Sequence, residues 1–144
     1  MAANNSPIYP IRGDQSTDNS TGMPTVVTGA SGDYDGTGSN NVKAHTAGSS
    51  GSFARSISFV AVGTNVASVA RVYLNNGSTH GTGSNNVPLD QVSLPAITAS
   101  NTAATVTITL PINKALKSGW QIWWGLGTAV AAGWVAVVDA GQYE

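Results

Sequence analysis

The stretch "DYDGTGSNN" (33–41) could bind a cation, because it carries hard oxygen donors at alternating positions. These donors are Asp33, Asp35, Ser39 and Asn41. The calcium-loop pattern also requires a glycine at its sixth position and a bidentate glutamate at its twelfth. Counted from Asp33, the sixth residue is Gly38, which fits, and the twelfth is Ala44, which cannot bind a metal. We therefore expect no metal site here and no bound cofactor.

Acid–base or nucleophilic catalysis would need a pair of groups that the sequence does not offer. His45 and His80 are the side chains that titrate near neutral pH, and neither has a carboxylate at metal-ligand spacing. There is no cysteine, and no serine lies in the Gly-x-Ser-x-Gly pattern of hydrolases. We expect a protein without catalytic residues.

Four tryptophans near the C-terminus could form a platform that stacks on sugars. In "WQIWWGLG" (120–127), however, strand alternation places one set of side chains on a single face, as in a core: Trp120, Ile122, Trp124 and Leu126. Trp134 follows on the next predicted strand, so it belongs to the same core. Trp123 alone points to the other face, where we expect it to contribute to an interface.

The composition indicates a single domain with an unusually uncharged surface. The chain has 144 residues, of which 9% are charged, whereas about 25% is typical. Six basic and seven acidic residues are scattered, so no basic stripe predicts nucleic-acid binding, and no apolar run is long enough to predict a membrane span. Few charges are available to protect the edge strands, and we therefore expect contacts with neighbouring subunits.

From residue 25 onward, short β-type runs alternate with Gly, Ser and Asn clusters. The predicted strands are Thr25–Gly29, Val42–Ala47, Phe53–Val62, Val69–Asn75, Val87–Leu94, Ala104–Leu110, Trp120–Thr128 and Gly133–Ala140. The strict alternation of "TVTITL" (105–110) puts Val106, Ile108 and Leu110 on one face of a half-buried strand, whereas 112–119 suits either a helical turn or a crossing loop. We predict an all-β protein, a single β-sandwich of jelly-roll or Greek-key type over residues 25–144.

The heptapeptide "GTGSNNV" occurs twice, at Gly36–Val42 and Gly81–Val87. The residues that follow the two copies do not match, so the repeat is a repeated loop and not a duplicated module. Glycine and asparagine both tolerate turn conformations, and each copy ends in a valine that begins a predicted strand.

Residues 1–24 contain three prolines and no apolar periodicity, which predicts an extended N-terminal arm. We expect its apolar patch to bind a partner subunit: Ile8, Tyr9, Pro10, Ile11 and the adjacent Arg12. Arg12–Asp14 also spells the adhesion tripeptide RGD, which three residues produce easily by chance.

Four stretches together resemble a family of small structural proteins of tailed bacteriophages: "VGTNVASVARVYLNNGST" (62–79), "SLPAITAS" (93–100), "LPINKALKSGW" (110–120) and "GLGTAVAAGW" (125–134). The characterised relatives look like head decoration or cement proteins. The resemblance covers about residues 53–140 and implies a β-sandwich on the outside of a virion, commonly oligomeric and without catalytic residues.

The function that we expect is decoration of an icosahedral capsid, with the major capsid protein as partner. The arm would act as the tether, and the chain would form a homo-oligomer, with a trimer favoured. Two alternatives stay open: a tail or fibre component, and a receptor- or carbohydrate-binding module that uses Trp123 and the duplicated loops.

Overall fold

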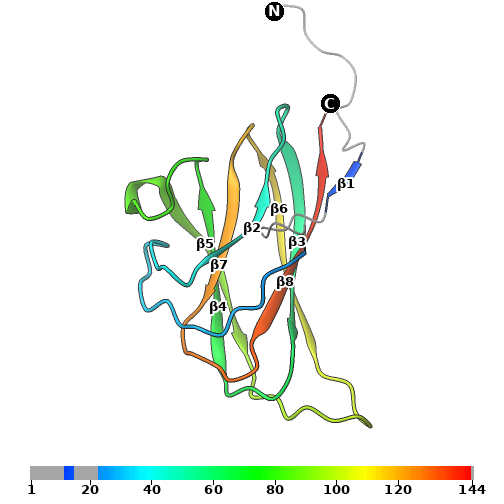
Figure 1. Ribbon diagram of the computed structural model, residues 1–144. Helices are drawn as coiled ribbons and strands as arrows, with labels where there is room; N and C mark the ends of the chain where they lie inside the picture. Colours follow the sequence, from blue (N-terminus) through cyan, green and yellow to red (C-terminus); the bar gives the residue numbers. More distant parts are fainter. Residues whose placement is uncertain (1–11, 15–22, 144) are drawn as a thin grey trace, which may run out of the picture.

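The computed structural model describes residues 12–14 and 23–143, which form two β-sheets facing each other (Figure 1). The strands in these residues are β1 (Arg12–Asp14), β2 (Val42–Thr46), β3 (Ser52–Ala61), β4 (Ser68–Asn75), β5 (Asn86–Leu94), β6 (Thr107–Leu116), β7 (Gln121–Leu126) and β8 (Trp134–Gln142). A single 3-10 turn, η1 (Gly83–Asn85), precedes β5. No helix in this part of the chain is long and apolar enough to cross a bilayer.

The strands pair as in one long antiparallel hairpin that is folded into the two sheets. β1 pairs with β8, β2 with β7, β3 with β6 and β4 with β5, all antiparallel. Further pairing of β8 with β3 and of β7 with β4 gives the sheet orders β1-β8-β3-β6 and β2-β7-β4-β5. This order is a jelly roll. The predicted single β-sandwich is confirmed, and the jelly roll is the observed one of the two topologies that the sequence left open.

Seven of the predicted strands are present, but the predicted strand Thr25–Gly29 is wrong. In this segment Val27 alone forms a β-bridge, exchanging two hydrogen bonds with Trp134 at the edge of the first sheet. Three residues later Ala30 pairs with Leu126 in the second sheet. The segment cannot be a strand of either sheet because it crosses the side of the sandwich from one to the other.

β6 is longer than the sequence indicated, because 112–116 continues the strand instead of forming a helical turn or a loop. Pro111 is tolerated since β6 is an edge strand, paired with β3 alone, where a missing N–H costs little. Asn113, with φ of 49°, lies where the register against β3 shifts, as in a β-bulge.

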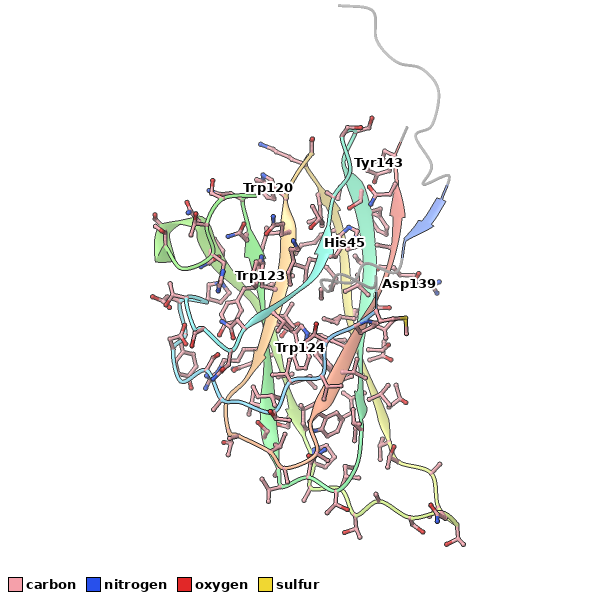
Figure 2. All side chains as sticks on the ribbon, in the orientation of Figure 1. His45, Trp120, Trp123, Trp124, Asp139 and Tyr143 are labelled. Carbon is pink, nitrogen blue, oxygen red and sulfur yellow. The ribbon has the colours of Figure 1, made fainter. Side chains whose placement is uncertain are left out.

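The core lies between the two sheets and is centred on aromatic side chains (Figure 2). Phe59 of β3 and Trp124 of β7 meet edge to face across the layers, with ring centroids 5.2 Å apart. Trp134 is also fully buried, as expected from its place on the next strand. The burial of Trp124 agrees with the alternation of "WQIWWGLG". Ile108 and Leu110 of β6 pack against this core, whereas Val106 precedes the strand and is exposed, which corrects its predicted place on the apolar face.

Candidate interaction surfaces

Part of the predicted arm belongs to the first sheet. Arg12–Asp14 forms β1 and pairs antiparallel with the end of β8, with Arg12 opposite Gln142 and Asp14 opposite Ala140. The backbone of the RGD tripeptide is therefore a sheet strand. Ile8, Tyr9, Pro10 and Ile11, which we expect to bind a partner, lie outside the described residues.

Trp123 lies on the outer face of the second sheet, as predicted, between Lys43 of β2 and Tyr73 of β4. The imidazole of His80 stacks on its indole, with centroids 4.0 Å apart and planes inclined by 17°. Nε1 of Trp123 donates a hydrogen bond of 2.8 Å to Oε1 of Gln121. One face of the ring is thus covered by the chain's own histidine, which argues against Trp123 as an open sugar platform.

The two copies of GTGSNNV lead into β2 and β5, which are the two edge strands of the same sheet (Figure 1). They approach each other over its outer face. A Cβ placed on Gly36 of the first copy would lie 3.2 Å from the Cβ of Asn86 in the second, and one placed on Gly83 would lie 3.1 Å from Oδ2 of Asp35. The duplicated sequence therefore forms one joined loop assembly, which we call the paired loops (residues 31–41 and 76–86).

The asparagines of the two copies help to close the paired loops. In each copy both asparagines donate from the side-chain amide to a main-chain carbonyl that lies earlier in the chain. The bonds run from Asn40 to Ala30 (2.6 Å), from Asn85 to Thr79 (2.9 Å), from Asn41 to Gly36 (3.0 Å) and from Asn86 to His80 (2.6 Å). These bonds explain the repeated residues as loop architecture.

The carboxylates of the proposed cation pattern serve the same architecture. Asp33 accepts hydrogen bonds from the amide of Gly38 (2.7 Å) and the hydroxyl of Thr37 (3.2 Å). Asp35 accepts from the hydroxyl (2.7 Å) and the amide (3.1 Å) of Thr37, and these bonds lower the pKa of its carboxyl. Across residues 23–143 no three acidic, histidine or cysteine side chains gather at a metal-binding distance.

His45, the other histidine, is fully buried (Figure 2). Its Nε2 lies 2.7 Å from Oγ of Ser52, so this hydrogen bond joins β2 of one sheet to β3 of the other. Because buried polar groups in folded proteins are usually hydrogen-bonded, we interpret the contact between His45 and Ser52 as structural.

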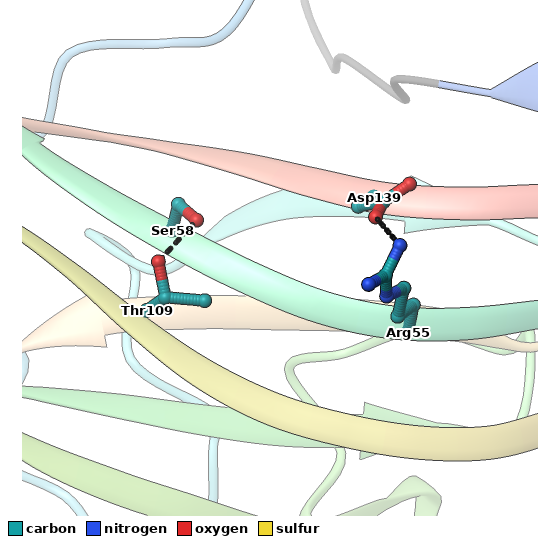
Figure 3. Close-up of polar contacts among 4 residues, drawn as sticks. All are labelled: Arg55, Ser58, Thr109 and Asp139. Carbon is teal, nitrogen blue, oxygen red and sulfur yellow. Dashed lines mark hydrogen bonds and ion pairs between the residues drawn. The ribbon is translucent and has the colours of Figure 1, made fainter.

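Two polar contacts join strands of the first sheet on its outer face (Figure 3). Ser58 of β3 and Thr109 of β6 form a cross-strand hydrogen bond of 2.9 Å between their hydroxyls. Arg55 and Asp139 form an ion pair of 3.6 Å whose side chains are 75% and 62% exposed. An exposed ion pair of this kind contributes at most about 1 kcal/mol to stability.

Proline residues and β-bulges protect the edge strands β5 and β6 of the sandwich. The low charge of the sequence had suggested that the edge strands lack protection. Pro88 lies on the edge strand β5 and Pro111 on the edge strand β6. The register against the neighbouring strand shifts beside each proline. Both devices hinder strand addition, so a partner is expected at the ends of the sandwich more than along β5 or β6.

The loops at one end of the sandwich contain no charged residues. Three loops meet there, 62–67, 95–106 and 127–133, opposite the end where β1 and the C-terminus lie (Figure 1). The stretches 56–70, 91–113 and 118–138 contain no Asp, Glu, Lys or Arg. Three valines at this end are largely exposed, Val62 at 53%, Val66 at 58% and Val106 at 55%. We call this surface the charge-free end.

Asn65 holds the charge-free end together from a buried position. Its main chain exchanges hydrogen bonds of 2.9 and 2.8 Å with Ile97. Its side-chain oxygen accepts from the amides of Ala132 and Gly133, both at 2.9 Å, and its Nδ2 donates to the carbonyl of Gly133 at 2.8 Å. The main chain and side chain of this one residue thus tie the three loops into one surface.

A pocket of about 270 Å³, which no sequence pattern predicted, lies beside the paired loops. Tyr34 of the first loop and Arg71 of β4 line one side, and residues 88–91 of β5 line the other. Arg71 is the lone charge in the apolar strand "SVARVYLN", which is the signal that could have singled it out. No sequence pattern could have singled out Tyr34, because the position of its loop over β4 depends on the tertiary structure.

Comparison of the sequence with protein-family models, with curated proteins and with solved structures found no match in any of the three. Function must therefore be inferred from the surfaces of the fold and from the composition of the chain.

Proposed function

We propose that this protein is a non-enzymatic capsid decoration protein, which binds the outer surface of an icosahedral phage head and stabilises contacts between major capsid protein subunits. The charge-free end is the observation that carries the proposal. The resemblance of 62–79, 93–100, 110–120 and 125–134 to tailed-phage structural proteins supports the same role.

The charge-free end has the chemistry of a buried contact. Interfaces between subunits are depleted of charge at their centre, whereas a free monomer usually surrounds exposed apolar side chains with charge. Val62, Val66 and Val106 have no charged neighbour within their loops. Because Asn65 fixes the loops before binding, little conformational entropy would be lost when a partner covers them.

The arm supplies a second contact region at the other end of the domain. β1 pairs with β8 beside the C-terminal end of the strand, far from the charge-free end (Figure 1). Residues 1–11, with the apolar patch Ile8–Ile11, precede β1 and are proposed to tether the protein to the capsid. A domain with contacts at both ends can bridge two neighbouring subunits, as cementing requires.

Repetition over a shell would make weak contacts sufficient, because many linked binding events act together. We propose that copies of the chain also associate with each other, as a trimer at a symmetry axis. The scattered charges, with a net charge of −1, favour a protein partner over nucleic acid.

The copy number of this chain in purified virions, measured by quantitative mass spectrometry against the major capsid protein, tests the proposal. A ratio near one to one, or a simple fraction set by the symmetry axes, is the expected result. A handful of copies per particle would instead identify a tail or fibre component, and absence from particles would refute a virion role.

A further inference from the structure

The pocket beside the paired loops is built from rigid parts. Tyr34 is 67% exposed, yet its ring lies over the guanidinium of Arg71, with Cζ 4.0 Å from the ring centroid. Arg71 in turn donates from Nη1 to the carbonyl of Ser31 at 3.0 Å, and the hydroxyl of Tyr73 donates to the carbonyl of Asp33 at 3.2 Å. These bonds anchor the residues that precede Tyr34 in the first loop to β4.

Arg71 retains unused hydrogen-bond donors at the pocket wall. Within the described part of the chain no carboxylate lies within ion-pair distance of its guanidinium, and its buried Nε has no hydrogen-bond partner. Stacking against Tyr34 fixes the plane of the guanidinium without using its N–H groups. A guanidinium held in place with free donors is suited to bind oxygen atoms of a ligand.

The opposite wall supplies acceptors and an apolar surface. Asp90 and Gln91 line the pocket next to Pro88 and Leu89. The carboxylate of Asp90 accepts one hydrogen bond of 2.7 Å, from the amide of Gln91, and an ionised carboxylate can accept several more. The lining thus combines donors, acceptors and apolar faces within one small volume.

The charge and size of the pocket restrict the ligand. One arginine and one aspartate line it, so its formal charge is zero, which disfavours a ligand that carries a net charge of either sign. Its volume of about 270 Å³ is below the range of about 300–1,000 Å³ that drug-sized ligands occupy. A single ring with hydroxyl groups at its edge and an apolar C–H face matches both properties.

We propose that this pocket binds one uncharged pyranose residue of a glycan. Pro88 and Leu89 pack against the C–H face of the sugar, and Asp90 and Gln91 accept from its hydroxyl groups. Arg71, whose guanidinium is held in place by the ring of Tyr34, donates to the hydroxyl oxygens. The site does not involve Trp123, and it lies on the outer face of the second sheet, where the guanidinium of Arg71 lies next to Gly127.

The test uses the full-length chain and backbone amide NMR, titrated with the methyl glycosides of glucose, galactose, mannose and N-acetylglucosamine. We expect at least one glycoside to shift the amides of residues 71–73 and 89–91 saturably, with a dissociation constant on the order of 1–10 mM, as suits a ligand of this size. If none of the four glycosides shifts these amides at concentrations on the order of 0.1 M, the proposal is wrong.

Matched variants locate the site. Tyr34→Ala should weaken binding at least about 10-fold, and Gln91→Ala should weaken it as well, while both keep the unfolding midpoint of the parent because both side chains are exposed. Tyr143→Ala removes a tyrosine beyond the end of β8 and should leave binding unchanged (Figure 2). Equal affinity of Tyr34→Ala and the parent chain would overturn the assignment to this pocket.

Charged sugars test whether the pocket prefers an uncharged ligand. Glucuronate and glucosamine should bind more weakly than methyl glucoside, since the pocket has no net formal charge to offset the cost of removing an ionised group from water. Tenfold tighter binding of either would show that the pocket selects charge. These outcomes are independent of the capsid proposal, whose tests concern the arm, the charge-free end and the composition of particles.

Discussion

The side-chain amide of Asn65 and the main chain of Gly133 are joined by two hydrogen bonds, one in each direction. Oδ1 of Asn65 accepts from the amide of Gly133 at 2.9 Å, and Nδ2 donates to its carbonyl at 2.8 Å. The residues are 68 positions apart, so the pair closes the charge-free end between the β3–β4 and β7–β8 connections. A second amide, that of Ala132, reaches the same Oδ1.

Replacing Asn65 should therefore destabilise the fold strongly. Asn65→Ala leaves the amides of Ala132 and Gly133 without partners, and we expect a loss of about 2–4 kcal/mol in the free energy of unfolding. Urea denaturation measures it. Asn101→Ala, an exposed asparagine of a neighbouring loop, is the control and should change stability by less than about 0.5 kcal/mol. Equal effects would show that the Asn65 bonds contribute nothing specific.

Gly36 and Gly81 occupy the same place in the two GTGSNNV copies but should respond differently to mutation. Gly36 has φ of +80°, and an added Cβ would lie 3.0 Å from ring atoms of Tyr73, whereas an added Cβ at Gly81 meets nothing within 4 Å. Gly36→Ala should cost more than about 1 kcal/mol, and Gly81→Ala should be nearly neutral. Thermal unfolding of both variants decides this, and similar melting temperatures would contradict it.

Tyr73 should titrate at higher pH than an ordinary tyrosine. Burial raises the pKa of its phenol, partly offset by the nearby Arg71. Because the folded pKa is raised, the stabilisation from this group is present below about pH 10 and is lost as the pH rises through the raised value. Tyrosinate absorbance should show one late-titrating tyrosine that is missing in Tyr73→Phe. A folded protein whose tyrosines all ionise together near pH 10 would contradict this prediction.

The charge-free end should lose partner binding when a charge is introduced. Val66→Asp and Val106→Asp place a carboxylate on exposed positions, so folding should be preserved, while burial of that charge in an interface should weaken binding at least about 10-fold. Sedimentation with heads that lack this chain measures the binding. Val87→Asp is the control, since Val87 is 60% exposed and lies at the start of β5, away from this end. Unchanged binding by both end variants would reject this interface.

Two deletions separate the tether from the first strand. Removing residues 1–11 spares β1, so the unfolding midpoint should be close to that of the full chain while binding to heads is lost. Removing residues 1–20 also removes the pairing of Arg12–Asp14 with β8 and should lower stability in addition. If the shorter deletion still coats heads at full occupancy, the arm is not the tether.

Local patterns were sufficient to predict most strands and the core. The alternation in "WQIWWGLG" correctly separated buried Trp124 from half-exposed Trp123, because side chains alternate between the faces of any strand. The asparagines and glycines of GTGSNNV correctly predicted a repeated loop, because their turn preferences are local properties.

Predictions failed where pairing partners decide the structure. Arg12–Asp14 has no strand pattern, yet it forms β1 because the edge of β8 supplies hydrogen bonds to its backbone. Thr25–Gly29 has a strand pattern, yet it crosses between the sheets because Trp134 and Leu126, the partners of Val27 and Ala30, lie in different layers.

The sequence by itself determined an all-β, nearly uncharged chain with turn residues at regular intervals, since composition and periodicity act over a few residues. Only the tertiary structure decided which loops share a surface. It joined the two GTGSNNV copies, placed Tyr34 over Arg71 and tied three uncharged loops to Asn65. Those contacts link residues about 40 to 70 positions apart, and their distances depend on how a jelly roll winds the whole chain, which no local pattern encodes.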